Sequence, residues 1–296
     1  MPYDSAFGQM MHNVFGGFDY AVFSAFGAIQ NDIFTFLAKV FTCFGEPIFG
    51  AMLGFLALIL VCFKRTRKIG FLLGLAVFFF LLFNHIILKN ALLRLRPYNV
   101  LQGDSQYLVW YMNAGAIAET PFCFPSGHTC LIFAVATVLF FWLKKEKKKS
   151  GAWILFIFAA FVACSRIYLM LHFATDVIFG CIEGILIGLL VWYGVTFFAN
   201  NLEKMPNFIQ KLFDIDAEKL ISRKTGRELN GKLVCTIIIL VVLGFWLTTF
   251  IQFNNQIAKQ IRCQHEGPDY ICMNKAESKT FNDQTNKWEF HCKEHK

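Results

Sequence analysis

The stretch PSGHTCLIFAVATVLFFWL, residues 125–143, decides the fold class of this chain. Four residues with helix-start and polar character lead directly into an apolar run. The chain has five other apolar runs: Ile48–Phe63, Phe71–Leu88, Trp153–Cys164, Val177–Phe198 and Leu233–Ile251. A helix needs about 20 residues to cross a hydrocarbon core of about 30 Å. With 56% hydrophobic residues and 36 Phe, the sequence predicts an all-α polytopic transmembrane helix bundle of about six membrane helices.

These runs divide the chain into a core and its additions. We expect one helical core over 45–200, preceded by an interfacial amphipathic segment over 1–44 with one or two helices. A membrane-crossing segment within 1–44 is the less favoured alternative, and no cleavable signal peptide is expected. A cytoplasmic linker over 201–232, with a possible interfacial helix over Pro206–Leu220, leads to an extra transmembrane helix over 233–251. A polar, cysteine-containing tail over 252–296 completes the chain.

The net charge of +8 has a topological explanation. Its basic residues concentrate in three segments that follow the first, third and fifth predicted helices: Lys64–Lys68, Lys144–Lys149 and Lys204–Lys232. The three segments therefore lie on one side of the membrane, and the positive-inside rule makes that side cytoplasmic. Nucleic-acid binding is not expected. The N-terminal segment, the loop 97–125 and the tail are predicted to be extracytoplasmic, in a multi-pass protein of the plasma membrane.

Three polar strings occur where apolar runs end, and all three fall on the predicted outer face. Ionisable side chains at such positions are costly and therefore functional by default. Lys89 and Arg96 are seven residues apart, about two helical turns, so both are expected to point the same way as an anion clamp before Pro97 ends the helix. Arg94 faces elsewhere and is expected to snorkel to the headgroups. Its replacement by Ala should change activity little.

The other two strings supply a hydroxyl, two imidazoles and a carboxylate. Ser126 can cap the helix that follows, and Gly127 lets an anion approach the backbone amides closely. His172 and Asp176 are four residues apart, so the carboxylate could hold one imidazole nitrogen and leave the other free to attack. Each string alone has a plain structural explanation, such as snorkelling, an ordinary helix start or a structural histidine. Their coincidence on one face predicts a single phosphate-binding pocket.

The three strings together resemble a known signature. Lys89 with Arg96-Pro97, then Pro125-Ser126-Gly127-His128, then Ser165-Arg166 with His172 and Asp176, is similar to the type 2 phosphatidic acid phosphatase superfamily, which includes vanadium haloperoxidases and glucose-6-phosphatase. Many membrane relatives have three crossings before the first string, whereas this chain has two and an interfacial segment.

The resemblance implies a haloperoxidase-like helical core and a role for each residue. His172 would be the nucleophile that forms a phosphohistidine, Asp176 would orient it, and His128 would protonate the leaving group. The phosphoryl oxygens would be held by Lys89, Arg96, Ser126, Gly127 and Arg166. The family works without a metal ion or other cofactor, so none is expected here.

We therefore expect a metal-independent lipid phosphatase that removes a terminal phosphate at the outer leaflet. Candidate substrates are phosphatidic acid, phosphatidylglycerol phosphate and undecaprenyl diphosphate, and the sequence carries no prediction of oligomeric state. A phosphotransferase that uses the same phosphohistidine is the main alternative. A lipid transporter is less favoured because the polar groups cluster at one face, and a binding protein with a dead site is disfavoured by the intact histidines.

Two further features lie outside the signature. Cys263, Cys272 and Cys292 in the tail predict a disulfide, with one thiol left over or paired with Cys123; a zinc site with His265 and His291 is the alternative. Glu183 lies inside the fifth predicted helix, where it could line the substrate cavity or pair with a buried polar group. Simple packing is the equally favoured alternative, and Glu183 is not placed among the catalytic residues. The spacing of Gly180, Gly184 and Gly188 predicts close helix packing.

Overall fold

A computed structural model describes residues 4–214, 216–219, 223, 231–265, 276–282 and 287–292. Within these residues, five helical spans are long and apolar enough to cross a membrane: Arg67–Leu92, Gly127–Lys145, Ser150–Tyr168, Ala174–Asn200 and Thr236–Asn255. A sixth is possible if Asp32–Gly45 and Pro47–Cys62, which meet at a bend of 43°, count as one broken span. The predicted all-α membrane bundle of about six helices is confirmed.

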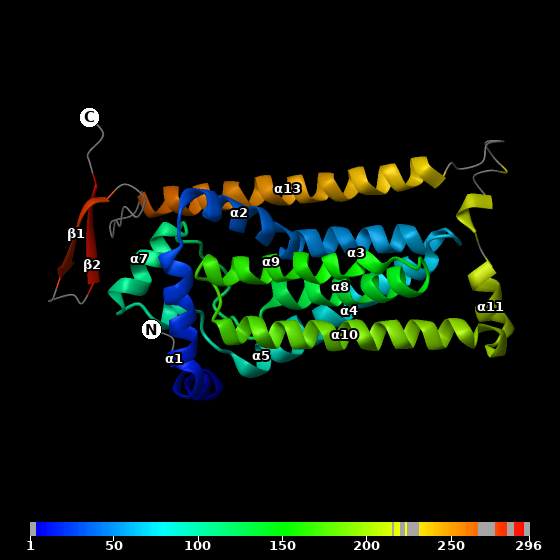
Figure 1. The fold of residues 1–296 in the computed structure, drawn as a ribbon, viewed down its shortest axis with the longest axis horizontal. Coiled ribbons are helices and arrows are strands. Elements are labelled where there is room, and N and C mark those ends of the chain that lie inside the picture. Colours follow the sequence, from blue (N-terminus) through cyan, green and yellow to red (C-terminus); the bar gives the residue numbers. More distant parts are fainter. Residues whose placement is uncertain are drawn as a thin grey trace.

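The membrane helices run side by side along the long axis of the molecule (Figure 1). Those of the core are α3 (Pro47–Cys62), α4 (Arg67–Phe80) with a π-helical continuation (Leu81–Leu88) and α5 (Lys89–Leu92), α8 (Gly127–Lys145), α9 (Ile154–Tyr168, after a 3₁₀ turn Ser150–Trp153), and α10 (Ala174–Asn200). The short helices α6 (Pro97–Val100) and α7 (Ser105–Asn113) lie at one end of this bundle. Two of these helices extend beyond their apolar runs into polar residues, because α8 includes His128 and α9 includes Arg166.

Helix α8 is the centre of the bundle, and a stripe of glycines on α10 lets the two helices touch. A Cβ atom on Gly180 would lie 2.7 Å from the carbonyl oxygen of Ser126, and one on Gly184 would lie 2.4 Å from that of Cys130. On Gly188 it would lie 2.4 Å from the Thr137 Cβ. The predicted close packing is confirmed. This contact holds the start of α8 against the second turn of α10, which fixes two of the three signature strings relative to each other.

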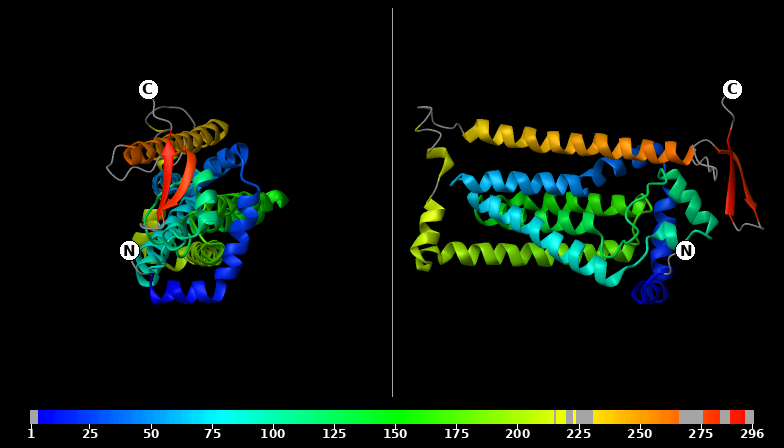
Figure 2. Two further views of the ribbon diagram at one scale, coloured as in Figure 1. Left: turned by 90° about the vertical axis from the view of Figure 1, so that its left-hand side faces the viewer. Right: turned by 180° about the vertical axis from the view of Figure 1, so that it is seen from behind.

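The N-terminal segment crosses the end of the bundle that carries α7. Helix α1 (Ala6–Ala28) lies transverse to the membrane helices, as both Figure 1 and Figure 2 show. This orientation agrees with an interfacial helix. Helix α2 (Asp32–Thr42) differs, because it leads through a 3₁₀ turn (Cys43–Gly45) into α3 with only the 43° bend between them. The boundary predicted at residue 44 therefore cuts through one continuous helical path.

Beyond the core, the chain continues along the outside of the bundle. A 3₁₀ turn (Leu202–Lys204) and α11 (Asn207–Asp214) follow α10 at the end opposite α7, so a helix forms inside the predicted linker. Helix α13 (Gly231–His265) lies on the periphery and extends past the predicted end at residue 251. The tail then forms an antiparallel hairpin of β1 (Ala276–Asn282) and β2 (Lys287–Cys292), which the sequence analysis did not anticipate.

The predicted tail disulfide stays a prediction. Cys272 lies outside the described residues, and the side chains of Cys263 and Cys292 are not among those described. The alternative pairing of Cys123 is wrong: its thiol is free, fully buried and donates to the carbonyl oxygen of Leu95 at 3.1 Å.

Candidate active site

The three signature strings meet at the end of the bundle that α1 and α7 cover. The backbone amide of Ser126 donates to the carbonyl oxygen of Asp176 at 3.0 Å, which joins the second string to the third. Arg96 Nη1 lies 3.1 Å from His172 Nε2, which joins the first string to the third. The structure therefore brings together residues that the sequence analysis could only place on a common face. The roles assigned to them remain predictions.

The Lys89–Arg96 segment takes a different path from the predicted one. The helix ends at Leu92 because Leu93 adopts a left-handed conformation, with φ of 50°. The chain then runs extended, and Leu95 forms an isolated antiparallel bridge with Phe122. The helical-spacing argument for Arg96 was thus wrong, and Pro97 begins the short helix α6 instead of ending α5. Arg96 still faces the site, because the bridge to residues 121–123 turns the extended segment inward.

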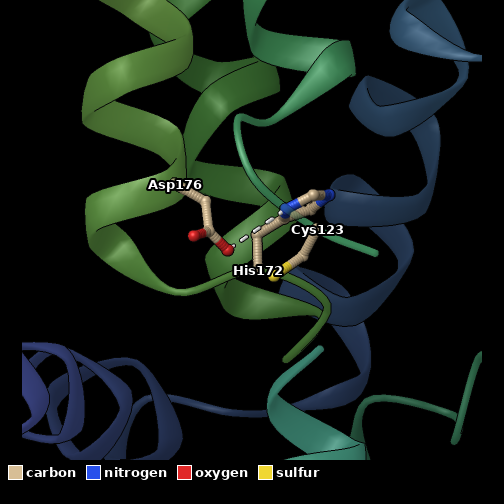
Figure 3. A group of neighbouring side chains, drawn as sticks. All are labelled: Cys123, His172 and Asp176. Carbon is tan, nitrogen blue, oxygen red and sulfur yellow. Dashed lines mark ion pairs between the residues drawn. The ribbon is translucent and has the colours of Figure 1, made fainter. Parts of the chain in front are cut away.

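The His172–Asp176 pair sits at the start of α10. Asp176 is the third residue of this helix, and one of its carboxylate oxygens accepts the Phe173 amide at 3.0 Å and lies 3.5 Å from His172 Nδ1. Figure 3 shows the carboxylate turned toward the imidazole, with the Cys123 side chain beside the ring. Because the Arg96 guanidinium has only N–H donors to offer, His172 Nε2 must accept from it. This contact favours the tautomer that carries its proton on Nδ1 and keeps a lone pair on Nε2.

The surroundings of His172 favour the neutral imidazole. Its side chain is 1% exposed. Burial, followed by the positive charges of Arg96 and Arg166, holds the pKa of His172 well below its ordinary value. The ring is therefore uncharged near neutral pH and has the lone pair that a nucleophile requires.

A cation cradle, formed by Lys89, Arg96 and Arg166, adjoins His172 Nε2. Two of its members share a carboxylate that the sequence analysis missed: Glu119 lies 2.8 Å from Arg96 Nη2 through one oxygen and 2.5 Å from Arg166 Nη2 through the other. Burial opposes ionisation of Glu119, but the charges of Arg166 and Arg96 outweigh it and hold its pKa below the ordinary value. Nothing in the local sequence marks Glu119, since it lies in the loop between α7 and α8.

Lys89 completes the cradle without a partner of its own. Among the described residues, its ammonium group has no hydrogen-bond or ion-pair partner, and it lies beside Gly127, on which a Cβ would be 3.7 Å from the Lys89 Nζ. Gly127 is the first residue of α8. Ser126 is the N-cap residue, as predicted, but its hydroxyl does not cap the helix; it accepts from the Thr129 hydroxyl at 3.1 Å. The amides at this helix start are therefore left for another acceptor.

His128 follows one residue later and contacts a second missed carboxylate. Its Nε2 lies 3.1 Å from Glu46 Oε1, just before α3. Gly45 permits this approach, because a Cβ there would lie 2.6 Å from the Cβ of His128. Arg166 reaches the same turn and donates to the Thr42 hydroxyl at 2.5 Å. Residues near 42–46 thus form one wall of the site.

Arg94 was predicted to snorkel to the headgroups, and this prediction is wrong. Its side chain is 1% exposed and forms ion pairs with Asp176 at 2.5 Å and with Asp19 of α1 at 3.0 Å. The helical extrapolation failed here for the same reason as for Arg96: beyond Leu93 the chain is extended, and Arg94 turns toward the protein interior. The expectation that Arg94→Ala changes activity little rested on that exposed position, so the structure does not support it.

Two groups of three potential metal ligands occur in the described part of the chain. Cys123, His172 and Asp176 form one, and Glu46, Glu119 and His128 form the other, with donor atoms within 4.8 Å of one another. Several members of these groups already have partners within the protein: Cys123 donates to a backbone carbonyl, Glu119 binds two arginines, and His128 contacts Glu46. We assign no metal to either group.

An apolar groove of about 640 Å³ lies on the side of the bundle, next to the second signature string. Its walls come from α1, the π-helical segment and α10, and include Phe7, Phe15, Phe83, Leu88, Pro125 and Phe179. Glu183 also lines it and accepts from the buried Asn84 Nδ2 at 2.8 Å, so the expected pairing with a buried polar group is confirmed. Its place in a substrate cavity stays a prediction. The groove meets the signature at Pro125 and passes beside Leu88, the neighbour of Lys89.

Comparison with known proteins agrees with this geometry. Residues 66–199 match the sequence model of the PAP2 superfamily. The chain is 32% identical over 127 residues to an undecaprenyl-diphosphatase of Sulfolobus acidocaldarius, covering 43% of this chain and 55% of that protein. It is 36% identical over 104 residues to phosphatidylglycerophosphatase B of Bacillus subtilis, covering 33% of this chain and 48% of that protein. The matched segment thus spans about half the length of these curated relatives.

A solved structure extends the comparison beyond the signature. The crystal structure of a transmembrane PAP2-type phosphatidylglycerolphosphate phosphatase from Bacillus subtilis superposes with a TM-score of 0.51 and 27% identity, covering 68% of this chain and 93% of that one. The fold, the membrane helices and the sequence match agree with one another. Residues 66–199 of this integral membrane protein thus match the PAP2 superfamily, and the helical core that contains them resembles a solved PAP2-type phosphatase.

Proposed function

We propose that this protein is a membrane lipid phosphatase that removes a terminal phosphate through a phosphohistidine on His172. The observation that carries the proposal is the cation cradle beside His172 Nε2. Lys89, Arg96 and Arg166 bring three formal positive charges, and Glu119 offsets one of them. A net charge of about two positive units, with guanidinium forks aimed at one carboxylate, suits a phosphate dianion that takes the place of Glu119.

The proposed reaction uses the groups in the order of their positions. The phosphate enters the cradle, Arg96 Nη1 turns from His172 Nε2 to a phosphoryl oxygen, and Nε2 attacks the phosphorus. The bond from phosphorus to the leaving oxygen breaks, and His128 donates a proton to that oxygen. Asp176 stabilises the imidazolium through Nδ1–H. Water then attacks the phosphohistidine, His128 accepts its proton, and inorganic phosphate leaves. The three cations supply the charge stabilisation, so the proposal requires no metal.

The lateral groove supports an amphiphilic substrate. Its walls are aromatic and aliphatic, and it runs from the side of the bundle to Pro125. A lipid could place its head in the cradle and leave its chain in the groove, which a soluble sugar phosphate would not need. The named relatives, an undecaprenyl-diphosphatase and a phosphatidylglycerophosphatase, support the lipid phosphate class. We propose the extracytoplasmic face for the site, because the basic segments lie at the opposite end of the bundle.

A phosphate-release assay tests this function. The purified full chain in detergent micelles would be given phosphatidic acid, phosphatidylglycerol phosphate and undecaprenyl diphosphate, with and without EDTA. We expect release from at least one lipid and no loss with EDTA. Phosphate appearing on an added acceptor lipid instead of in solution would favour the phosphotransferase. Absence of turnover on all three lipids would overturn the proposal.

A further inference from the structure

Arg94 belongs to neither the family signature nor the cation cradle, yet it is as buried as the catalytic dyad. Its guanidinium donates from Nη1 to Asp176 Oδ1 at 2.5 Å and to the Thr175 hydroxyl at 2.8 Å, and from Nη2 to Asp19 at 3.0 Å. The Phe173 ring lies under it, with 4.0 Å from the guanidinium carbon to the ring centroid. The side chain is therefore held from three directions.

Asp19 comes from α1, outside the residues that match the PAP2 superfamily. One of its carboxylate oxygens accepts the backbone amide of Thr175 at 2.9 Å, and the other accepts the Thr175 hydroxyl at 2.9 Å as well as Arg94. Its side chain is 1% exposed. A buried carboxylate is costly unless it is fully paired, and Asp19 has a donor on both oxygens.

Further contacts hold α1 to the segment that carries Arg94. The Ser5 hydroxyl donates to the carbonyl oxygen of Leu92 at 2.6 Å, and the amide of Leu95 donates to Asp4 at 2.9 Å. These two contacts lie on either side of Arg94 in the sequence. The position of the guanidinium therefore depends on α1 through the backbone as well as through Asp19.

The arrangement has a consequence for His172. Asp176 has one oxygen on Arg94 and the other directed at His172 Nδ1. Paired with Arg94 alone, the Asp176 charge would be largely neutralised and would stabilise an imidazolium poorly. Asp19 offsets the Arg94 charge, so the three groups together keep one net negative charge facing the ring.

We propose that Asp19 and Arg94 are positioning residues for the nucleophile: together they fix the Asp176 carboxylate and preserve its charge for His172. This inference rests on the proposed function, since it concerns the same phosphohistidine. It adds that the transverse helix α1 is part of the catalytic apparatus and not only a membrane-surface attachment.

The test is the kinetics of Asp19→Asn in the purified full chain, with a lipid phosphate that the wild type hydrolyses. We expect kcat to fall by roughly ten- to a hundredfold, which is typical when a residue that orients a reactive group through hydrogen bonds is replaced. KM and inhibition by orthovanadate should change by less than about twofold, because the cradle is untouched. A role in stability alone would lower the yield of folded protein and leave the kcat of the folded fraction unchanged.

The pH profile gives a second readout. Removing the Asp19 charge makes the surroundings of His172 more positive, which lowers its pKa, so the acid limb of kcat/KM should move to lower pH. The charged and titratable groups around the ring that remain in this variant are Asp176, Arg94, Arg96, Arg166, Lys89, His128 and Cys123.

Coupling and controls sharpen the result. The double variant Asp19→Asn, Arg94→Gln should lose less kcat than the product of the two single losses. The reason is that the charges of Asp19 and Arg94 balance each other, and the double variant removes both. Asp32→Asn, an exposed aspartate at the start of α2, should leave kcat at the wild-type value. If Asp19→Asn does not yield folded protein, Arg94→Lys, which keeps the charge but loses the fork, should show the same fall in kcat with unchanged vanadate inhibition.

The two proposals fail separately. An inactive wild type overturns the proposed function. An active wild type with Asp19→Asn at wild-type kcat, or with equal losses in kcat and vanadate affinity and no shift of the acid limb, overturns the positioning role alone.

Discussion

Two clusters of charged side chains lie on either side of His172, and they are built in opposite ways. On the Nδ1 side, Arg94 is saturated by two carboxylates, Asp19 and Asp176. On the Nε2 side, Arg96 and Arg166 share the single carboxylate Glu119, and Lys89 has no partner among the described residues. The saturated cluster fixes geometry, whereas the under-neutralised cluster is suited to bind an anion. Charge balance, more than residue type, distinguishes a structural arginine from a ligand-binding one.

The largest expected effect comes from replacing His172, which lies between the two clusters. His172→Asn should lower kcat by about 10⁴-fold or more, because the nucleophile is lost while both clusters remain. Phosphate release from micelles is the measurement, and His12→Asn, an exposed histidine on α1, is the matched control. Near-normal turnover in His172→Asn would refute the phosphohistidine mechanism.

Weakening the anion-binding cluster should have the next largest effect. Arg166→Lys keeps the charge but loses the planar fork that now holds Thr42 and Glu119. We expect kcat/KM to fall by about 10²-fold, the usual cost of a lost preorganised donor, with weaker inhibition by orthovanadate. Arg65→Lys, on a side chain that is 66% exposed at the opposite end, serves as the control. Unchanged vanadate inhibition would remove Arg166 from the cradle.

Altering the single carboxylate of the cradle should act in the other direction. Glu119→Gln leaves the three cations without a competing negative charge, so phosphate and vanadate should inhibit more strongly, on the order of tenfold, or ~1.4 kcal/mol. Release of the product phosphate should slow as a consequence, and kcat should fall while KM falls with it. The measurement is the inhibition constant of phosphate and of vanadate in Glu119→Gln and in the wild type. Weaker inhibition in Glu119→Gln would mean that this carboxylate supports the arginines and does not compete with the substrate.

The smallest expected effect is a shift in pH dependence. The pKa of His172 is held below its ordinary value by burial and then by Arg96 and Arg166. A depressed pKa keeps the imidazole neutral in the folded protein at a pH where an exposed histidine is already protonated. Activity that depends on His172 should therefore persist below about pH 6.5 and be lost only as the pH falls through the depressed value.

Two substrates with different phosphate pKa values separate the enzyme from the substrate in this profile. A lipid monophosphate and a lipid diphosphate should share an acid limb if it belongs to His172. A limb that moves with the substrate would instead report ionisation of the phosphate. A common limb at or above pH 6.5 would contradict the protected, neutral imidazole.

Two features of the sequence, the apolar runs and the signature strings, predicted the membrane bundle and a phosphate site. The apolar runs predicted the helices, because lipid requires each crossing segment to satisfy its own backbone hydrogen bonds. The signature predicted a phosphate site at the ends of those helices. Helical spacing then failed at Arg94 and Arg96, because it cannot reveal that Leu93 takes a left-handed conformation and ends the helix.

The sequence by itself determined the fold class, the match to the PAP2 superfamily and the residues proposed to carry the chemistry, since these follow from local composition and local spacing. Only the tertiary structure decided which carboxylate neutralises which cation. Asp19, Glu46 and Glu119 are ordinary acidic residues in the sequence; Asp19 and Glu46 lie far from the signature strings, and Glu119 lies outside them in the loop before Pro125. Each gains its place through contacts across long stretches of chain, because charge pairing depends on distances of a few ångströms that no local pattern encodes.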